Sequence, residues 1–350
     1  ENMNDPYNMK NKLYAHLDTL NMIVKNKPWH SFCLEIHPTN YCTHNCTDCT
    51  SSPYRLHHPK QYLPAPELFK VLKRFSQLQG KSILWSGGGE PCSYKCKLTN
   101  KRFLDIAQYA ASLALQQGLY TNGSCLNDEL SDYILDKFEF IRISLDAFTE
   151  TTYKSIRKTD DYLRVMKTLQ HLIHLKKERG INTCIGISFV LRENNLNDLN
   201  CLKSWVTQYP VDYIYFRPVV NSEGSTLNED LLENAYSRIH DAEKSTRSVK
   251  LITRLNKANG NLATPCHYHY FCPCLSADGN LYQCCHHIGN KKFLLAAPSG
   301  EALSILDTAL DRRDKVYIDN TCPINCRAVA INNEITQLIA CQQYTHKNFM

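Results

Sequence analysis

The stretch Cys42-Thr43-His44-Asn45-Cys46-Thr47-Asp48-Cys49 places three cysteines on one short segment. It follows Phe32–His37, whose alternating apolar residues predict a β-strand. Thiolates at this spacing sit on one tight loop and can converge on a single centre of a soft metal or an iron–sulfur cluster. The sequence therefore predicts a site for a soft metal or an iron–sulfur cluster directly after the first strand.

Further short apolar runs predict strands, and segments of helical period lie between them. Strands that alternate with helices indicate an α/β fold, with a parallel sheet, open or closed, and helices outside. Right-handed crossovers place the functional loops at the carboxyl ends of the strands. The six predicted strands are Phe32–His37, Ser82–Ser86, Gly118–Thr121, Phe140–Leu145, Cys184–Leu191 and Tyr213–Pro218.

The remainder of the chain is organised differently. A long predicted helix that contains Val165 and Ile173 ends at Gly180, a residue suited to a helix C-cap. After the sixth strand we predict a helix near Leu231–Ala242, a cysteine-rich segment and a closing helix. The domains expected are an N-terminal extension (1–29), the α/β domain (30–220), a connecting helical segment (221–262) and a cysteine-rich domain with a C-terminal helix (263–350).

The composition indicates an ordinary globular protein, with 350 residues, 43% hydrophobic and 21% charged. No apolar stretch approaches the roughly 18 residues of a membrane span, and the first 25 residues do not resemble a secretory signal. We therefore expect a cytoplasmic protein with no membrane partner. The net charge of +6 permits an anionic ligand but does not argue for nucleic acid.

The 17 cysteines are unusual for a chain expected in a reducing compartment, where disulfides are rare. Metal ligation or reactive thiols explain them better. One interpretation of the first loop is a structural zinc site, closed by His44, His57 or His58 as a fourth ligand. The other is a cluster with one iron left open for a ligand.

A second motif favours the open cluster. Trp85-Ser86-Gly87-Gly88-Gly89-Glu90-Pro91 ends the second predicted strand. A CxxxCxxC loop after the first strand and a Gly-Gly-Glu motif after the second resemble those of the radical S-adenosylmethionine (radical SAM) enzymes, over about residues 30–220. This resemblance implies a partial (β/α)6 TIM-like barrel. It also implies a 4Fe–4S cluster on Cys42, Cys46 and Cys49, whose open iron is chelated by S-adenosylmethionine, and a 5′-deoxyadenosyl radical that abstracts hydrogen.

The resemblance also implies contacts to S-adenosylmethionine. Gly88 and Gly89 let the backbone approach a ligand closely, and Glu90 can accept hydrogen bonds from the ligand's ammonium group. At the ends of the third and fourth predicted strands, Asn122 and Ser144 match ribose-contacting or carboxylate-contacting positions. Arg157 matches a position that often pairs with the methionyl carboxylate. The plainer alternatives are a turn for Asn122, a helix N-cap for Ser144 and a surface charge for Arg157.

One position departs from the family. The residue before the third cysteine is commonly aromatic and packs near adenine, whereas this chain has Asp48. Tyr41 or Tyr54 could replace that contact. The departure does not affect the cluster ligands.

The C-terminal segment carries a second set of cysteines. Leu275–Tyr282 predicts a β-hairpin with an Asp-Gly turn, flanked by cysteines. This arrangement resembles the SPASM and twitch groups of radical SAM enzymes, which hold auxiliary 4Fe–4S clusters. We favour one auxiliary cluster, because a regular CxxCx5C run is absent. Structural zinc remains the alternative, and Cys284 and Cys285 could exchange roles. The implied ligands are Cys266, Cys284, Cys322 and Cys326.

Two thiols outside these sets follow strand ends, where the radical would form. They are Cys92 and Cys125. A thiol at that place can return a hydrogen atom to a substrate radical, which is the step that an epimerase needs. Packing is the alternative role for both.

We therefore expect a radical SAM oxidoreductase that oxidises a small polar metabolite (a sugar or an aminocyclitol) or a peptide. A redox-neutral epimerase and a radical peptide (RiPP) crosslinking or thioether enzyme are the alternatives. The expected reductant is a protein such as flavodoxin or ferredoxin. Two other classes, a nucleic-acid-modifying enzyme and a non-catalytic metal-binding protein, are distinguished by salt-dependent RNA binding and by release of 5′-deoxyadenosine.

Overall fold

The structure is a computed structural model. It describes residues 9–25, 27, 30–221, 224–225, 227–246, 248–253, 265–298, 306, 318, 322, 326 and 328–342. The predicted domain boundary at residues 262 and 263 lies outside these residues.

The described strands form one curved sheet and one small ribbon. The sheet has the strand order β12-β11-β10-β1-β2-β3-β4-β5-β6-β9, in which β10, β1 to β6 and β9 run parallel. The ribbon pairs β7 with β8. The strands are β1 (Cys33–Ile36), β2 (Ser82–Trp85), β3 (Gln116–Thr121), β4 (Phe140–Ser144), β5 (Cys184–Leu191), β6 (Tyr213–Pro218), β7 (Val220–Asn221), β8 (Gly224–Ser225), β9 (Lys250–Thr253), β10 (Cys274–Leu275), β11 (Leu281–Tyr282) and β12 (Leu294–Ala296).

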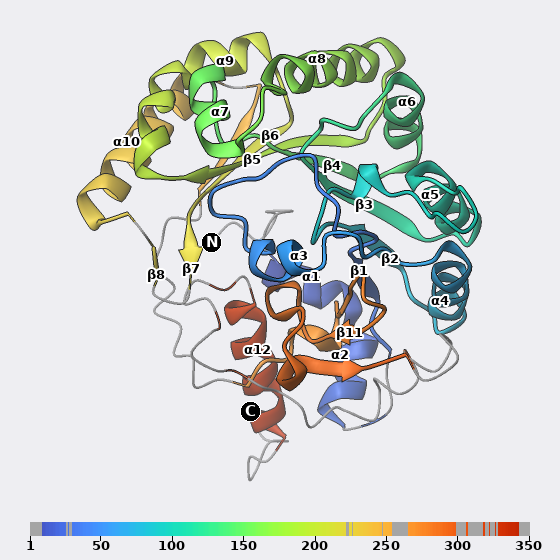
Figure 1. The fold of residues 1–350 in the computed structure, drawn as a ribbon. Coiled ribbons are helices and arrows are strands. Elements are labelled where there is room, and N and C mark those ends of the chain that lie inside the picture. The colour runs from blue at the N-terminus through green and yellow to red at the C-terminus, as the bar shows by residue number, and fades with distance from the viewer. Residues whose placement is uncertain are drawn as a thin grey trace.

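Helices cover the outer side of this sheet (Figure 1). Their apolar faces and alternate residues of the strands form one buried core, in which Leu72, Ile141 and Phe216 are fully buried. The helices in this layer are α4 (Ala65–Gln77), α5 (Phe103–Ser112), α6 (Asp128–Lys137), α7 (Glu150–Arg157), α8 (Tyr162–Arg179), α9 (Leu202–Gln208) and α10 (Glu229–Ser245).

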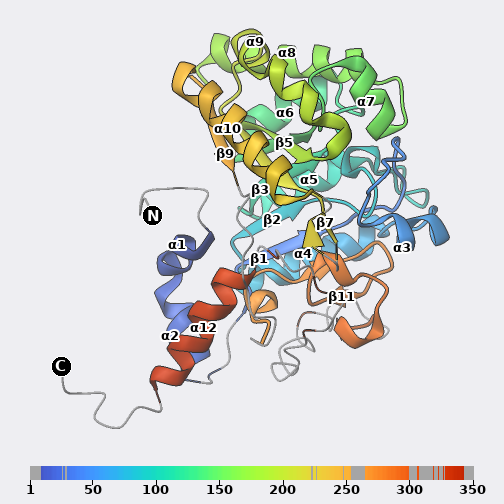
Figure 2. The ribbon, with the colours of Figure 1, turned by 90° about the vertical axis from the view of Figure 1, so that its left-hand side faces the viewer.

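The remaining helices lie elsewhere. The short helix α3 (Ser52–His57) follows the cysteine loop, which lies within the curve of the sheet (Figure 1). Three helices, α1 (Met9–Leu13), α2 (Leu17–Val24) and α12 (Val329–Cys341), stand together beside the sheet (Figure 2). They bury a second apolar cluster that includes Ile23 and Ile335. Within the described ranges, no helix has the length and apolar character needed to cross a bilayer.

The predicted α/β fold is confirmed, a curved parallel sheet with helices outside and a cysteine-rich C-terminal region. All six predicted strands are present, and Gly180 ends α8 in the left-handed region with a φ of 64°. The hairpin is also present, with Gly279 in its turn at a φ of 82°. Several strand pairings were not predicted, and two of them extend the parallel sheet. β9 extends the sheet beyond β6, and β10 joins the hairpin to β1.

Candidate functional site

The cysteine loop, residues 37–51, runs from β1 to α3 and is held by backbone hydrogen bonds from two sides. The amides of Asn45 and Thr47 donate to the carbonyls of Arg157 and Ile156 at the end of α7, over 3.2 and 3.1 Å. The amide of Glu90 donates to the carbonyl of Tyr41 over 2.8 Å. The loop is therefore fixed between α7 and the turn after β2.

Two side chains reach the thiols of this loop. Arg157 Nη1 donates to Cys46 Sγ over 3.4 Å, and Asn122 Nδ2 lies 3.9 Å from Cys42 Sγ. Burial is the largest effect on Cys42 and raises the pKa of its thiol to about 12. Donors that point at the sulfurs suit thiolates that ligate a cluster, because hydrogen bonds to the sulfurs tune iron–sulfur centres.

The spacing of possible ligand atoms also bears on the zinc alternative. Among the described residues, the one group of three such atoms within 4.8 Å of one another is Glu35, His37 and Cys274. The cysteine loop supplies no such group, and His44 Nε2 faces Asp161 over 3.3 Å. Four ligands at about 2.0–2.3 Å from a single zinc ion need closer packing.

The glycine motif packs directly on the cysteine loop. A Cβ on Gly89 would lie 2.0 Å from the carbonyl oxygen of Tyr41, so only glycine fits there. A Cβ on Gly88 would lie 2.6 Å from Asn40 Oδ1, a buried acceptor without a hydrogen-bond partner in the described structure. An acceptor that lacks a donor at this point fits the amino group of S-adenosylmethionine. Sequence reasoning missed Asn40, because an asparagine in a loop has no distinctive pattern.

Glu90 is fully buried and joins the ends of two strands. Its Oε1 accepts from Thr121 Oγ1 (2.6 Å) and from the amide of Cys92 (3.1 Å). Its Oε2 accepts from the amide of Asn122 over 2.7 Å. Burial is the largest effect and raises the pKa of this carboxyl, while the hydrogen bonds oppose that rise. In this structure Glu90 therefore orders the site through its protein contacts.

The loop after β3 meets the cysteine loop through side chains. Asn122 Nδ2 donates to Thr43 Oγ1 over 3.0 Å, and the hydroxyls of Thr43 and Ser124 lie 2.7 Å apart. The sequence places Thr43 between two candidate ligands but gives no sign of this contact. Asn122 is thus brought to the candidate cluster and buried there.

The two candidate hydrogen donors are both partly exposed. The thiol of Cys125 lies 3.8 Å from Ser124 Oγ. Cys92 packs against the buried core, next to Glu90. Burial raises the pKa of both thiols, and the carboxylate of Glu90 raises both pKa values further. Both side chains therefore hold their proton as neutral thiols.

An ion-pair network closes the other side of the loop. Asp146 Oδ2 lies 2.8 Å from Arg157 Nη2 and 3.3 Å from Arg192 Nη1. Arg192 Nε in turn donates to Asp48 Oδ2 over 2.7 Å. Asp48, which replaces the expected aromatic residue, thus has an ionic partner that only the three-dimensional structure reveals. Ser144 ends β4 and is half-buried on the inward face.

The two tyrosines that could replace the adenine contact differ in their surroundings. Tyr41 is 56% exposed. The hydroxyl of Tyr54 donates to Asp278 Oδ2 over 2.9 Å, in the turn of the C-terminal hairpin. Tyr54 therefore ties the segment after the cysteine loop to the cysteine-rich region.

Three of the four C-terminal cysteines gather at the second apolar cluster. Cys266, Cys284 and Cys326 pack against it. Burial raises the pKa of the Cys284 thiol, and the neighbouring thiols of Cys285, Cys266 and Cys326 raise it further. Cys322 Sγ lies 3.2 Å from His287 Nε2. Cys266, Cys284 and Cys326 therefore lie in one region together with Cys285, while Cys322 contacts His287.

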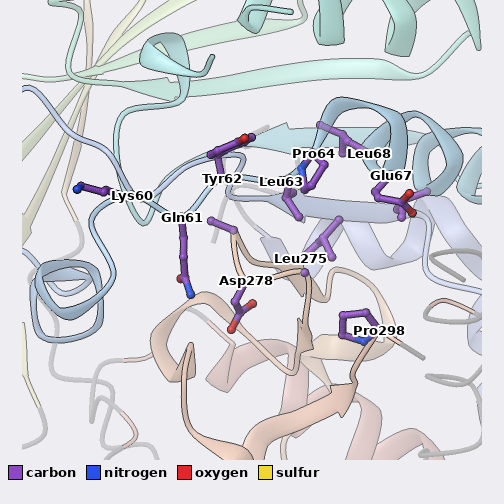
Figure 3. Close-up of a pocket in the computed structure, with 13 residues that line it drawn as sticks. Lys60, Gln61, Tyr62, Leu63, Pro64, Glu67, Leu68, Leu275, Asp278 and Pro298 are labelled. Carbon is purple, nitrogen blue, oxygen red and sulfur yellow. The ribbon is translucent and has the colours of Figure 1, made fainter. Parts of the chain in front are cut away.

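A separate cavity of about 610 Å³ lies between residues 60–71 and the hairpin turn (Figure 3). Leu63, Leu68 and Leu275 line it, with Glu67 and Asp278 at its rim. No predicted ligand or cofactor residue borders it. The cavity is thus distinct from the site described above.

Comparisons with known proteins bear on the family and the fold. Residues 36–202 match the Radical SAM superfamily. Over 233 residues the chain is 24% identical to GTP 3′,8-cyclase from Clostridium botulinum (strain Okra), covering 63% of this chain and 70% of that protein. A GTP 3′,8-cyclase from Psychromonas ingrahamii is 22% identical, over 59% of this chain and 61% of its own.

Solved structures share the fold at low sequence identity. SuiB of Streptococcus suis superposes with a TM-score of 0.61 and 15% identity, over 86% of this chain and 70% of SuiB. The structure of anSMEcpe with bound AdoMet gives a TM-score of 0.59 and 16% identity, over 81% of each chain. These likenesses support the architecture and leave the substrate open.

Proposed function

We propose that this chain, a radical SAM enzyme, oxidises a C–H bond of a small polar metabolite or a peptide. The match to the radical SAM family spans residues 36–202. When bound, the 4Fe–4S cluster and S-adenosylmethionine supply a 5′-deoxyadenosyl radical that takes one hydrogen atom from the substrate. Cys42, Cys46 and Cys49 are the proposed cluster ligands. The small metabolite we propose is a sugar or an aminocyclitol.

The proposed oxidation removes two electrons and two protons from the substrate. The first electron and proton leave together as the hydrogen atom that becomes part of 5′-deoxyadenosine. An auxiliary 4Fe–4S cluster, held by Cys266, Cys284, Cys322 and Cys326, would accept the second electron, and the second proton would pass to solvent. A protein reductant such as flavodoxin or ferredoxin supplies the electron that S-adenosylmethionine cleavage consumes.

The observation that carries this proposal is the pairing of β1 with β10. Glu35 pairs with Cys274, and Ile36 with Leu275. β1 leads into the cysteine loop, and the hairpin that begins with β10 leads to Cys284. A fixed relation between the two cysteine groups supports electron transfer from the substrate site to the auxiliary cluster.

The cofactor contacts we propose follow from the same geometry. The backbone at Gly88 and Gly89 and the buried Glu90 flank the amino end of S-adenosylmethionine. Further polar side chains lie after β3, at the end of β4 and at the end of α7. The further proposed contacts are Asn122, Ser144 and Arg157.

The similar structures bear on the substrate. SuiB has been seen bound to its precursor peptide SuiA, and anSMEcpe with AdoMet and the peptide Cp18Cys. These structures support a peptide, and with it crosslinking or thioether formation, as an alternative to a metabolite. The GTP 3′,8-cyclases act on a small molecule and support the metabolite.

A redox-neutral epimerase is the second candidate, and one observation favours it. Cys125 is a partly exposed, neutral thiol in the loop that also carries Asn122. Such a thiol can give a hydrogen atom to a substrate radical. Cys92, the other candidate donor, is also partly exposed and packs against the core.

Turnover with candidate substrates tests the proposal. The anaerobically reconstituted protein, supplied with dithionite and S-adenosylmethionine, should release 5′-deoxyadenosine slowly when alone. A true substrate should raise that rate and yield a product two hydrogens lighter. A substrate that raises the rate but returns with unchanged mass would support the epimerase instead.

A further inference from the structure

The concave face of the sheet carries two arginines that the proposed cofactor contacts do not use. On β4, Ile141 and Ile143 are buried in the core beneath the helices. Successive side chains of a strand point to opposite faces, so Arg142 points to the concave side. On β6, Ile214 and Phe216 are buried in the same core. Arg217, which follows Phe216, therefore also faces the concave side.

Arg142 lies deep in the concavity and is held by aromatic rings. Its guanidinium carbon lies 3.7 Å from the centre of the Tyr120 ring and 5.5 Å from that of Tyr215. Ring faces attract a cation, which stabilises the charge of this arginine without a carboxylate. Arg142 precedes Ser144 by two residues, so it lies farther from the carboxyl end of the sheet than the proposed cofactor contact.

Arg217 lies nearer to the open end. In the sheet register Ser144 is opposite Ser188, and Ser188 is opposite Tyr215. Arg217 pairs with Val190. This pair lies two residues beyond the pair of Ser188 and Tyr215, closer to the carboxyl end of the strands. The cysteine loop and Asn122 follow the carboxyl ends of β1 and β3. Arg217 is therefore on the side of the sheet where the radical forms.

The charge of Arg217 is not balanced by a carboxylate of its own. Within the described ranges no ion pair or hydrogen bond of its guanidinium is present. The carboxylate that acts on it is Asp146, which already pairs with Arg157 and Arg192. Burial lowers the pKa of Arg217, Asp146 opposes this effect, and the nearby positive charge of Arg142 lowers it further. A largely buried cation costs free energy unless a partner pairs with it.

We propose that Arg217 binds an anionic group of the substrate, a carboxylate or a phosphate. The planar guanidinium matches both groups with two parallel hydrogen bonds. Binding there would supply the missing partner and hold the substrate at the carboxyl end of the sheet. The inference rests on the proposed function, because it assumes that the substrate meets the radical within this concavity.

Inorganic phosphate is the probe for the test. In the reconstituted enzyme with S-adenosylmethionine and a reduced, paramagnetic cluster, phosphate bound near the cluster should show saturable broadening of its ³¹P resonance. R217M should weaken phosphate binding at least tenfold, and R217K, which keeps the charge, only a few-fold. R164Q, at an exposed arginine on α8, should behave as wild type. Acetate that displaces phosphate at similar concentration would identify a carboxylate site, and acetate that does not would identify a phosphate site.

Three results would overturn the inference. They are absence of saturable broadening in wild type, phosphate binding by R217M with the affinity of wild type, and a parallel rise in the KM for S-adenosylmethionine. The last would mean that Arg217 holds the methionyl carboxylate. Release of 5′-deoxyadenosine by the wild-type enzyme is measured in the same samples. Its absence would instead count against the proposed function.

Discussion

Arg157 Nη1 donates a hydrogen bond to Cys46 Sγ over 3.4 Å, so one guanidinium links the cysteine loop to the ion-pair network behind it. The same side chain lies 2.8 Å from Asp146 Oδ2 and is 8% exposed. Asp146 itself has a left-handed backbone, with a φ of 60°, and its Oδ1 accepts from the amide of Val190. Arg157 therefore supports both the fold at the end of β4 and the environment of a proposed cluster ligand.

Replacing Arg157 should destabilise the protein and loosen the cluster. R157Q leaves Asp146 buried with only Arg192 as a cationic partner, and breaking a buried pair costs about 3–5 kcal/mol. Denaturant unfolding and iron content measure the two effects. R157K should lose less stability, and R164Q should lose none. Wild-type stability and iron content in R157Q would contradict this role.

Glu90 should be needed for the shape of the site. E90Q replaces one carboxylate oxygen by an NH2 group, which cannot accept a hydrogen bond. The backbone amides of Cys92 and Asn122 now donate to different oxygens of Glu90, so one of them would lose its acceptor. A buried donor left without a partner costs about 1–3 kcal/mol. We expect lower stability and weaker S-adenosylmethionine binding by equilibrium dialysis. E67Q, at an exposed glutamate of α4, is the control. E90Q that binds the cofactor as wild type does would contradict the proposed contact.

Removing the auxiliary ligands should separate cofactor cleavage from product formation. The variant with Ala at Cys266, Cys284, Cys322 and Cys326 should lose about four irons but still release 5′-deoxyadenosine. The oxidised product should fall to background, because the second electron has no acceptor. The metal at this site is identified in the variant with Ala at Cys42, Cys46 and Cys49. Zinc in place of iron there would show that the auxiliary site is structural.

Turnover in heavy water distinguishes oxidation from epimerisation. Oxidation predicts a product two hydrogens lighter, with no solvent deuterium at the reacting carbon. An epimerase predicts deuterium delivered from an exchangeable thiol, and C125A or C92A would then block product while cofactor cleavage continues. We expect the oxidation result. Deuterated product of unchanged redox state would reverse that choice.

The sequence predicted local structure well where a pattern is repeated over neighbouring residues. The predicted limits of β5 and β6 agree with those in the structure, because apolar β-branched and aromatic residues recur along each strand. The pairing of β10 with β1 was harder to predict, because a strand of two residues has too short a sequence pattern. Contacts between distant segments, such as Arg192 with Asp48, depend on the assembled fold and leave no local signal.

The proposed ligands of the first cluster stand out in the sequence, because three cysteines lie close together in the chain. The surroundings of those ligands were not. Thr43, Asn40 and Asp146 are ordinary polar residues in sequence, and each gains a role only from what packs against it. Glu90 was expected to face the cofactor, and its three protein hydrogen bonds became visible only in the structure.

Release of 5′-deoxyadenosine tests the central claim most directly. Wild-type protein, reconstituted with iron and sulfide and reduced in the presence of S-adenosylmethionine, should release this nucleoside. The variant with Ala at Cys42, Cys46 and Cys49 should lose about four irons and release none, because these thiolates supply every protein ligand of that cluster. Release at the wild-type rate by this triple variant would contradict the account.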